Sequence, residues 1–178
     1  MNKIIVVYAS KYGSTKQYAQ WIASGLSCEA KEWKTVLPSD LNNYDTVIFG
    51  GGIYAGGING IAFLTKNFHL IREKNIILFT CGLADPQEEK NRSHIQASLA
   101  KLLTPEMQSQ IRCFFFRGAI DYSKLTFIHK AMMAMLHRVM LKKDASSLTE
   151  EDQMMLKTYG EKVSFLDKES IQPLIQSL

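Results

Sequence analysis

The chain has 178 residues, of which 46% are hydrophobic and 21% charged, and it carries a formal net charge of +4. These values are ordinary for a globular protein and exclude a disordered or fibrous class. The length fits one compact unit, so we expect a single domain over residues 1–178. The first residues lack the apolar stretch of a secretory signal, and no apolar run reaches the roughly 20 residues of a membrane-spanning helix. We therefore expect a cytoplasmic protein.

The three cysteines, Cys28, Cys81 and Cys113, are widely spaced. They form no Cys-x-x-Cys pair and have no histidine at ligand spacing, so we expect reduced thiols and no metal site.

Strand and helix patterns alternate along the first two thirds of the chain. Apolar runs typical of strands buried on both faces span residues 3–9, 46–50, 75–80 and 111–116. A more polar candidate for an edge strand spans residues 29–33. Helical patterns span residues 15–26, 61–71 and 92–103. This alternation predicts an α/β fold with a doubly wound parallel sheet.

The pattern changes after the fifth predicted strand. Residues 124–143 predict a Met-rich helix, and residues 149–165 predict another that closes the layered structure. The tail from Asp167 has no clear pattern.

The segment after the first predicted strand has the composition of an anion-binding loop. It leads directly into a helix and consists of Ser10, Lys11, Tyr12, Gly13, Ser14 and Thr15. Hydroxyl groups, a glycine and a helix N-terminus provide O–H and N–H donors for a phosphate. Fingerprints of dinucleotide and nucleoside triphosphate sites are absent. We expect a monophosphate here, the alternative being an ordinary capped helix start.

Two further loops supply candidate walls for a planar ligand at the carboxyl ends of the strands, where ligands of such sheets bind. The glycine-rich loop after the third strand offers Gly52, Ile53, Tyr54, Ala55, Gly56 and Gly57. We expect Tyr54 to stack on the ligand, the alternative being a flexible turn with a core tyrosine. The loop after the fourth strand offers Cys81, Gly82, Leu83 and Ala84.

With these three loops in place, the sequence resembles the flavodoxin family over about residues 1–120 and, less clearly, to about 165. The family's phosphate loop has the form Ser/Thr-x-x-Gly-x-Thr, which Ser10, Gly13 and Thr15 match. The resemblance implies a flavodoxin-like three-layer sandwich with strand order 2-1-3-4-5 and an extra helix after strand five. It also implies bound FMN, with its phosphate at 10–15 and its isoalloxazine between 52–57 and 81–84.

The segment after the fifth strand carries a closer resemblance. Gly118, Ala119 and Tyr122 precede a Met-rich basic helix at about 123–143, which is similar to the menaquinone-dependent protoporphyrinogen IX dehydrogenases of bacteria. Residues 117–143 hold six lysines and arginines against one acidic residue.

One face of this helix is expected to pack on the domain, namely Leu125, Ile128, Met132, Met135, Leu136 and Val139. Candidate substrate or membrane contacts outside that face are Arg117, Lys124, Phe127, Lys130, Met133 and Arg138. Such a surface suits an anionic membrane, a porphyrin or quinone, or a homodimer. The alternative is a helix covered by neighbouring elements.

Two main functions follow, beside a third interpretation in which the chain is a flavin-free regulatory or nucleic-acid-binding domain that uses the basic helix for phosphates. The first is an FMN-dependent oxidoreductase that oxidises protoporphyrinogen IX or a related substrate with a quinone acceptor. We expect no catalytic side chain, because the cofactor carries the chemistry. The basic charge favours this function, since a less negative surrounding stabilises an anionic reduced flavin. The second is a non-catalytic electron-transfer flavodoxin that serves partner oxidoreductases. We expect no nucleic-acid partner, and peripheral contact with the inner face of the membrane through 123–143.

Overall fold

The computed structural model describes residues 2–54, 57–148 and 150–178. Contacts within the chain define two compact units. The sheet unit comprises Met1–Gly118 and Leu166–Leu178, and the insert unit comprises Ala119–Phe165. A compact unit is not by itself an independently folding domain, so a single domain over 1–178 stays a prediction.

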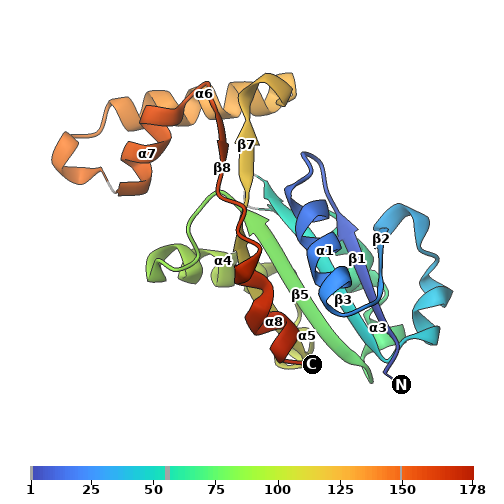
Figure 1. Ribbon diagram of the computed structural model, residues 1–178. Helices are drawn as coiled ribbons and strands as arrows, with labels where there is room; N and C mark the ends of the chain where they lie inside the picture. The colour runs from blue at the N-terminus through green and yellow to red at the C-terminus, as the bar shows by residue number, and fades with distance from the viewer. Residues whose placement is uncertain (1, 55–56, 149) are drawn as a thin grey trace. The chain divides into compact units, whose positions relative to one another are not determined.

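The sheet unit is built on a twisted parallel sheet (Figure 1). Its main strands are β2 (Glu29–Glu32), β1 (Ile4–Ala9), β3 (Thr46–Tyr54), β5 (Asn75–Gly82) and β6 (Ile111–Arg117), named in their order across the sheet. The short β4 (Gly57–Ile58) pairs antiparallel with the end of β3. Counted without β4, the order is 2-1-3-4-5, which confirms the prediction.

Helices cover both faces of this sheet. On one face lie α2 (Ile61–Lys66), α3 (Phe68–Ile71), α4 (Glu89–Leu102) and α5 (Pro105–Gln110), and on the other lie α1 (Ser14–Gly25) and α8 (Gln172–Gln176). Short 3-10 segments span Trp33–Thr35, Pro38–Asn43 and Glu169–Ile171. The predicted helix over 61–71 is divided at Asn67, and α4 begins three residues before the predicted start at Arg92.

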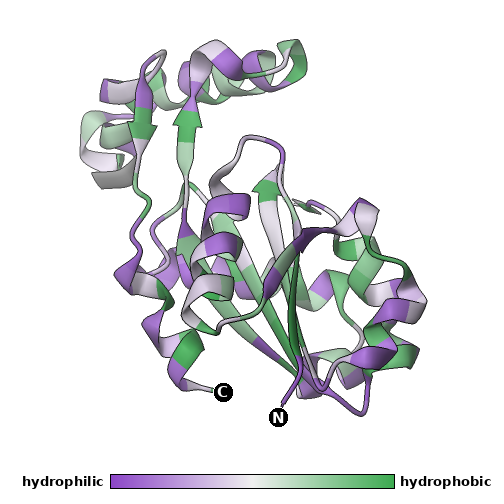
Figure 2. Ribbon diagram, turned by 45° about the vertical axis from the view of Figure 1, so that its right-hand side comes forward, coloured by the Kyte–Doolittle hydropathy of each residue, from purple (hydrophilic) through white to green (hydrophobic). Residues whose placement is uncertain are grey.

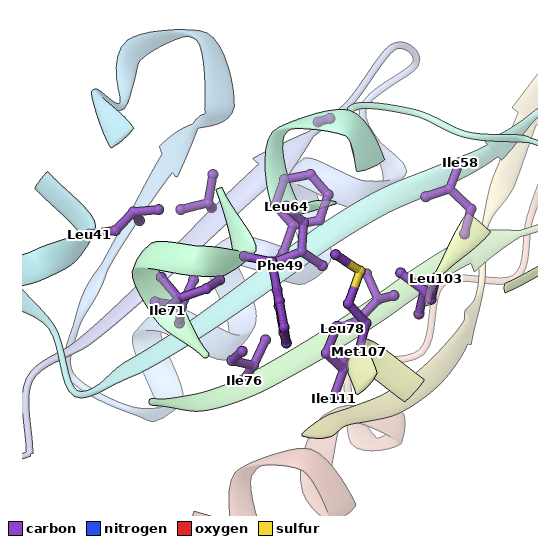
Figure 3. Close-up of a cluster of buried hydrophobic side chains, with 14 of the residues drawn as sticks. Leu41, Phe49, Ile58, Leu64, Ile71, Ile76, Leu78, Leu103, Met107 and Ile111 are labelled. Carbon is purple, nitrogen blue, oxygen red and sulfur yellow. The ribbon is translucent and has the colours of Figure 1, made fainter. Parts of the chain in front are cut away.

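The central strands are apolar on both faces, which explains why their sequences show no alternation (Figure 2). Phe49 and Leu78 share one core with residues of α2 to α5 (Figure 3). Ile48 and Ile77 share the other core with α1 and α8. The predicted three-layer α/β sandwich is confirmed.

Strand β3 extends to Tyr54, which corrects the assignment of Gly52, Ile53 and Tyr54 to a loop. Gly50 and Gly51 pair with both β1 and β5. A Cβ on Gly50 would lie 2.0 Å from Phe79 Cζ, and one on Gly51 would lie 2.4 Å from Ile58 Cγ2. Glycine is required here because neighbouring side chains occupy the space of a Cβ.

The C-terminal tail closes the second face of the sheet. Ile171 and Leu174 are buried in the same core as α1. The prediction that a helix over 149–165 closes the sandwich is therefore wrong. Thr149 lies outside the described residues, and α7 (Glu150–Thr158) ends before Gly160, whose φ of 88° does not continue a helix.

In its described residues, the insert unit consists of a two-stranded antiparallel ladder with two helices between its strands in the chain. β7 (Ala119–Asp121) pairs antiparallel with β8 (Lys162–Ser164), a strand that the helical prediction over 149–165 missed. Between them run α6 (Phe127–Leu141), α7 and 3-10 segments at Tyr122–Lys124 and Ala145–Ser147. Thr126 caps α6 by accepting a hydrogen bond from the His129 N–H. The predicted extra helix after the last strand of the sheet is α6.

Candidate functional site

The loop after β1 ends in a left-handed residue at the start of α1. Gly13 has a φ of 100° and is the N-cap of this helix. Its N–H donates a 3.1 Å hydrogen bond to Ser10 Oγ. Within the described residues, no side chain caps α1 and its first turn holds no acidic residue. The partial positive charge of the helix N-terminus therefore favours an anion at this loop.

The side chain of Tyr54, at the end of β3, lies against this loop. Its ring meets that of Tyr12 edge-on, with centroids 5.7 Å apart. The backbone N–H groups of Lys11 and Tyr12 donate hydrogen bonds to the Tyr54 hydroxyl oxygen. Burial raises the pKa of Tyr54 to about 12, so the phenol is neutral at physiological pH. The loop thus directs two N–H groups at one oxygen atom.

The start of α1 and the ends of β3 and β5 meet at three residues, Thr15, Gly52 and Cys81. Gly52 pairs in register with Cys81, and a Cβ on Gly52 would lie 3.2 Å from Thr15 Oγ1. The Thr15 hydroxyl hydrogen-bonds to the Cys81 thiol, while burial raises the pKa of Cys81 to about 12. The thiol therefore stays protonated and is no nucleophile at neutral pH.

The loop after β5 is held by the end of β6. The Gly82 carbonyl accepts a 2.6 Å hydrogen bond from the Gly118 N–H. Arg117 Nε donates to the Leu83 carbonyl at 3.0 Å, and the guanidinium forms a 3.4 Å ion pair with Asp85. Arg117 thus fixes this loop. Its contact with a substrate stays a prediction.

Ile53 fills the space between the ends of β3 and β5. A Cβ on Gly82 would lie 3.3 Å from Ile53 Cδ1. A pocket of about 170 Å³ opens beside it, lined by Ile53, Ile58 and Ala84 and by the α4 residues Asn91, His94, Ile95 and Ser98. Sequence reasoning missed the α4 residues, because a helical pattern does not show which end of a sheet its side chains line.

The remaining candidates of the third-strand loop are Ala55, Gly56 and Gly57. Ala55 and Gly56 lie outside the described residues. Gly57 pairs with Tyr54 in the short β3–β4 ladder.

Tyr18, in α1, is a positioning residue that the sequence analysis did not single out. Its hydroxyl donates a 2.7 Å hydrogen bond to the Arg117 carbonyl and accepts one of 3.1 Å from the Asp167 N–H. Its ring stacks on Phe116 with centroids 4.8 Å apart. One phenol therefore joins the end of β6 to the segment that precedes α8.

The exposed face of α6 carries five of the six residues that the sequence assigned to packing, so the assignment is wrong for these five. The sixth, Leu125, precedes α6 and is buried. Ile128 is 69% exposed and Met135 is 70% exposed. The other exposed members of this face are Met132, Leu136 and Val139.

A different face of α6 is covered within the insert unit. It carries the half-buried Met133 and His137 and the buried Met140. The His137 ring stacks on Tyr159 with centroids 3.9 Å apart. The packed face of α6 was predicted from hydrophobicity alone, which does not account for the packing of a histidine ring on a tyrosine ring. This explains why the prediction chose the wrong face. Of the predicted contact residues, Lys124, Phe127, Lys130 and Arg138 are exposed.

The described residues hold neither a membrane-spanning helix nor a cluster of metal ligands. Every helix within residues 2–54, 57–148 and 150–178 is too short or too polar to span a bilayer. No group of three or more His, Cys, Asp or Glu side chains within those ranges is placed to hold a metal ion.

The parallel sheet and its loops define an open, doubly wound α/β domain with the 10–15 loop at the point where the winding reverses. A family model for the flavodoxin domain matches residues 5–147, which is most of the chain. The chain therefore belongs to the flavodoxin domain family.

Solved structures with a similar fold include a flavoprotein from Lactobacillus acidophilus NCFM in complex with FMN. It is 17% identical over 66% of this chain and 93% of its own, with a TM-score of 0.46. Oxidised flavodoxin 2 from Bacillus cereus is 16% identical over 87% of this chain and 93% of its own, with a TM-score of 0.47. The comparison with curated protein sequences gave no match. Because these TM-scores are below 0.5, the assignment of the chain to its family rests on the family model and not on the similarity to solved structures.

FMN is the cofactor that membership of this family implies, and the residues present fit its phosphate. The Lys11 and Tyr12 N–H groups already hold an oxygen acceptor. The N-terminus of α1 adds a partial positive charge beside them. The family match thus supports the predicted cofactor.

Proposed function

We propose that the chain is an FMN-dependent oxidoreductase that oxidises a reduced organic substrate, protoporphyrinogen IX or a relative of it, with a quinone as acceptor. Bound FMN would supply the redox chemistry, taking two electrons from the substrate and giving them to the quinone. The observation that carries the proposal is the exposed apolar face of α6, because an electron-transfer domain alone has no need of it.

The protein's own residues bind and orient the cofactor in this proposal. The N–H groups of the 10–15 loop hold the phosphate, with Gly13 providing the left-handed bend. Gly52 and Cys81 form a close wall at the ends of β3 and β5, since a larger residue at position 52 would meet Thr15. Arg117 keeps the 82–85 loop in place through Leu83 and Asp85.

The α6 surface supplies the apolar and cationic contacts. Ile128, Met132, Met135 and Val139 recur at a spacing of four, three and four residues and form one exposed stripe. Exposed Arg138 and Lys142 lie on the same helix or directly after it. An apolar stripe edged by cations suits an anionic membrane surface, where quinones dissolve. Cytoplasmic location with peripheral contact at the inner face of the membrane belongs to this proposal.

Anaerobic turnover tests the reaction. The FMN-loaded chain is mixed with protoporphyrinogen IX and a soluble naphthoquinone, and porphyrin fluorescence is followed against a reaction without protein. Acceleration that depends on the quinone supports the dehydrogenase. No acceleration, with the flavin verified as bound and reducible, removes this substrate.

Vesicle binding tests the α6 surface separately. The variant Ile128→Gln/Met135→Gln should lose about tenfold or more of its binding to vesicles containing phosphatidylglycerol, because each change removes a large apolar contact. Leu37→Gln is the matched control, since Leu37 is an exposed apolar residue of the sheet unit. Equal binding by all three proteins would contradict membrane contact through α6. A concentration-dependent dimer that the double variant abolishes would favour self-association.

The alternative is a non-catalytic electron-transfer flavodoxin serving partner oxidoreductases. Membership of the flavodoxin domain family supports it. A carrier should take up electrons in two separate one-electron stages during anaerobic titration with dithionite, and it should fail the turnover test. A dehydrogenase should be reduced in a single two-electron stage.

A further inference from the structure

The hydroxyl of Tyr54 is held where the anion-binding loop directs its N–H groups. Lys11 and Tyr12 contribute consecutive backbone N–H groups to this one oxygen. Two adjacent N–H groups that point at a common atom form the kind of concave site that binds a phosphate oxygen. A neutral phenol is a weaker partner for such donors than a charged phosphate, whose hydrogen bonds are charge-assisted.

The ring of Tyr54 also fills the space beside the loop. A Cβ on Gly52 would lie 2.8 Å from Tyr54 Cε2 and 3.1 Å from the Tyr54 hydroxyl oxygen. The same Cβ would lie 3.2 Å from Thr15 Oγ1, so the phenol and the Thr15 hydroxyl border one small volume. A phosphate bound by the Lys11 and Tyr12 N–H groups would have to occupy the place of the phenol oxygen.

We propose that Tyr54 acts as an internal competitor of the FMN phosphate, occupying the donors of the 10–15 loop until a phosphate group displaces it. The proposal rests on the FMN binding proposed above and adds to it a residue that sets affinity and selects for the phosphate. The backbone of Tyr54 is paired with Gly57, so displacement is a rotation of the side chain.

This competition has a direct consequence for ligand choice. A ligand that binds only after the phenol leaves has its apparent affinity reduced by the fraction of molecules that are open. FMN and inorganic phosphate both carry the anion that recovers the two N–H hydrogen bonds. Riboflavin has no phosphate, so it cannot replace the phenol as the acceptor of these hydrogen bonds.

The variant Tyr54→Phe tests the proposal, because it keeps the ring and removes the oxygen. We expect the dissociation constants of FMN and of inorganic phosphate to fall by about threefold to tenfold, because the variant lacks the oxygen that competes for the two N–H groups. Riboflavin affinity should change by less than about twofold. FMN and riboflavin are followed by flavin fluorescence, and inorganic phosphate by isothermal titration calorimetry.

Tyr44→Phe is the matched control. The Tyr44 hydroxyl donates a 2.5 Å hydrogen bond to Glu29 Oε1. Tyr44 precedes β3 and lies at the end of the sheet opposite the 10–15 loop. The ligand affinities of Tyr44→Phe should therefore equal those of the wild type. A second readout does not depend on affinity and uses ¹H–¹⁵N spectra of the protein without flavin. In the wild type, added phosphate should shift the amide signals of Lys11 and Tyr12. The variant Tyr54→Phe should shift the same signals without added phosphate.

The outcomes separate the two proposals. Tighter FMN and phosphate binding by Tyr54→Phe, with riboflavin unchanged, supports the competition. Unchanged or weaker phosphate binding overturns it, and an equal gain for riboflavin overturns it in favour of a ring that merely blocks the site. A wild-type chain that binds no FMN would refute the proposed function, while the phosphate titration and the amide signals would still decide the role of Tyr54.

Discussion

The sheet unit and the insert unit differ in what they do with their apolar side chains. In the sheet unit, strand residues such as Ile77 and Leu78 are completely buried between two helical layers. In the insert unit, Phe127 is 87% exposed and Met135 is 70% exposed. Soluble monomers rarely expose apolar groups in a continuous stripe. The sheet unit thus buries its apolar side chains within its own layers, whereas the α6 surface leaves apolar side chains in contact with water, as the proposed membrane contact requires.

The largest expected effect separates the cores of the two units. Leu78→Ala should lower the free energy of unfolding by about 2–5 kcal/mol, because it leaves a cavity in a closed core. Met135→Ala should change it by no more than about 0.5 kcal/mol, since the side chain is largely in water. Urea denaturation followed by circular dichroism measures both. A loss above about 2 kcal/mol for Met135→Ala would show that this face is covered in solution.

The next effect concerns the connection between β6 and the C-terminal segment. Tyr18→Phe removes the hydroxyl that bonds to the Arg117 carbonyl and the Asp167 N–H. Leaving these groups unpaired should cost about 1–3 kcal/mol of unfolding free energy. Tyr8→Phe is the control, because the described residues give the Tyr8 hydroxyl no hydrogen-bond partner. Equal urea midpoints for the two variants would refute this role of Tyr18.

The parts of the fold that depend on local pattern could be predicted from the sequence. The β-branched runs around Val47 and Ile77 and the helix starting after Gly13 lie where periodicity and capping place them. The strand order follows from the family resemblance, and the 10–15 loop precedes a helix as expected.

The rest depends on contacts between residues far apart in the chain. Gly52 was taken for a loop residue because glycine is flexible, but it pairs as a strand residue with Cys81, which lies 29 residues later. The face of α6 was reversed because His137 packs on Tyr159. No signal in the sequence indicates that Tyr54 lies against the 10–15 loop. A tyrosine suits both roles, stacking on a bound ligand or filling the ligand's place, so the residue type alone does not distinguish them.

Alkaline pH should affect the sheet unit through Cys81. Burial raises the pKa of this thiol above its ordinary value to about 12 in the folded chain. Its stabilising contribution is therefore complete below the pKa of the unfolded thiol and is lost as the pH rises from there toward 12. Between about pH 8 and about pH 10.5, Cys81 should account for a loss of about 2–2.5 kcal/mol.

The variant Cys81→Ala checks this assignment. Its unfolding free energy should fall less than that of the wild type over the same pH interval, whatever its stability at neutral pH. Cys28→Ala is the comparison, because burial raises the pKa of that thiol too, although it is only half-buried. Parallel pH profiles for wild type and Cys81→Ala would assign the alkaline loss to other groups, among them Tyr54.

The smallest effect uses two helix caps, one in each unit. Thr104 accepts a hydrogen bond from the Met107 N–H at the start of α5, and Thr126 accepts one from the His129 N–H at the start of α6. Each Thr→Ala change should cost its helix about 1 kcal/mol. Because α5 belongs to the core that unfolds with the sheet, Thr104→Ala should lower the global urea midpoint.

Thr126→Ala should instead accelerate amide hydrogen exchange within α6 and leave the midpoint of the sheet unit unchanged, provided that the insert unit opens on its own. Native-state hydrogen exchange with mass spectrometry distinguishes the two cases. A shift of the global midpoint as large as that of Thr104→Ala, with no local acceleration, would mean that the two units unfold as one. The exposed α6 surface would then belong to the same cooperative structure as the buried sheet, and its side chains could be varied for vesicle binding only at a cost to the cofactor site.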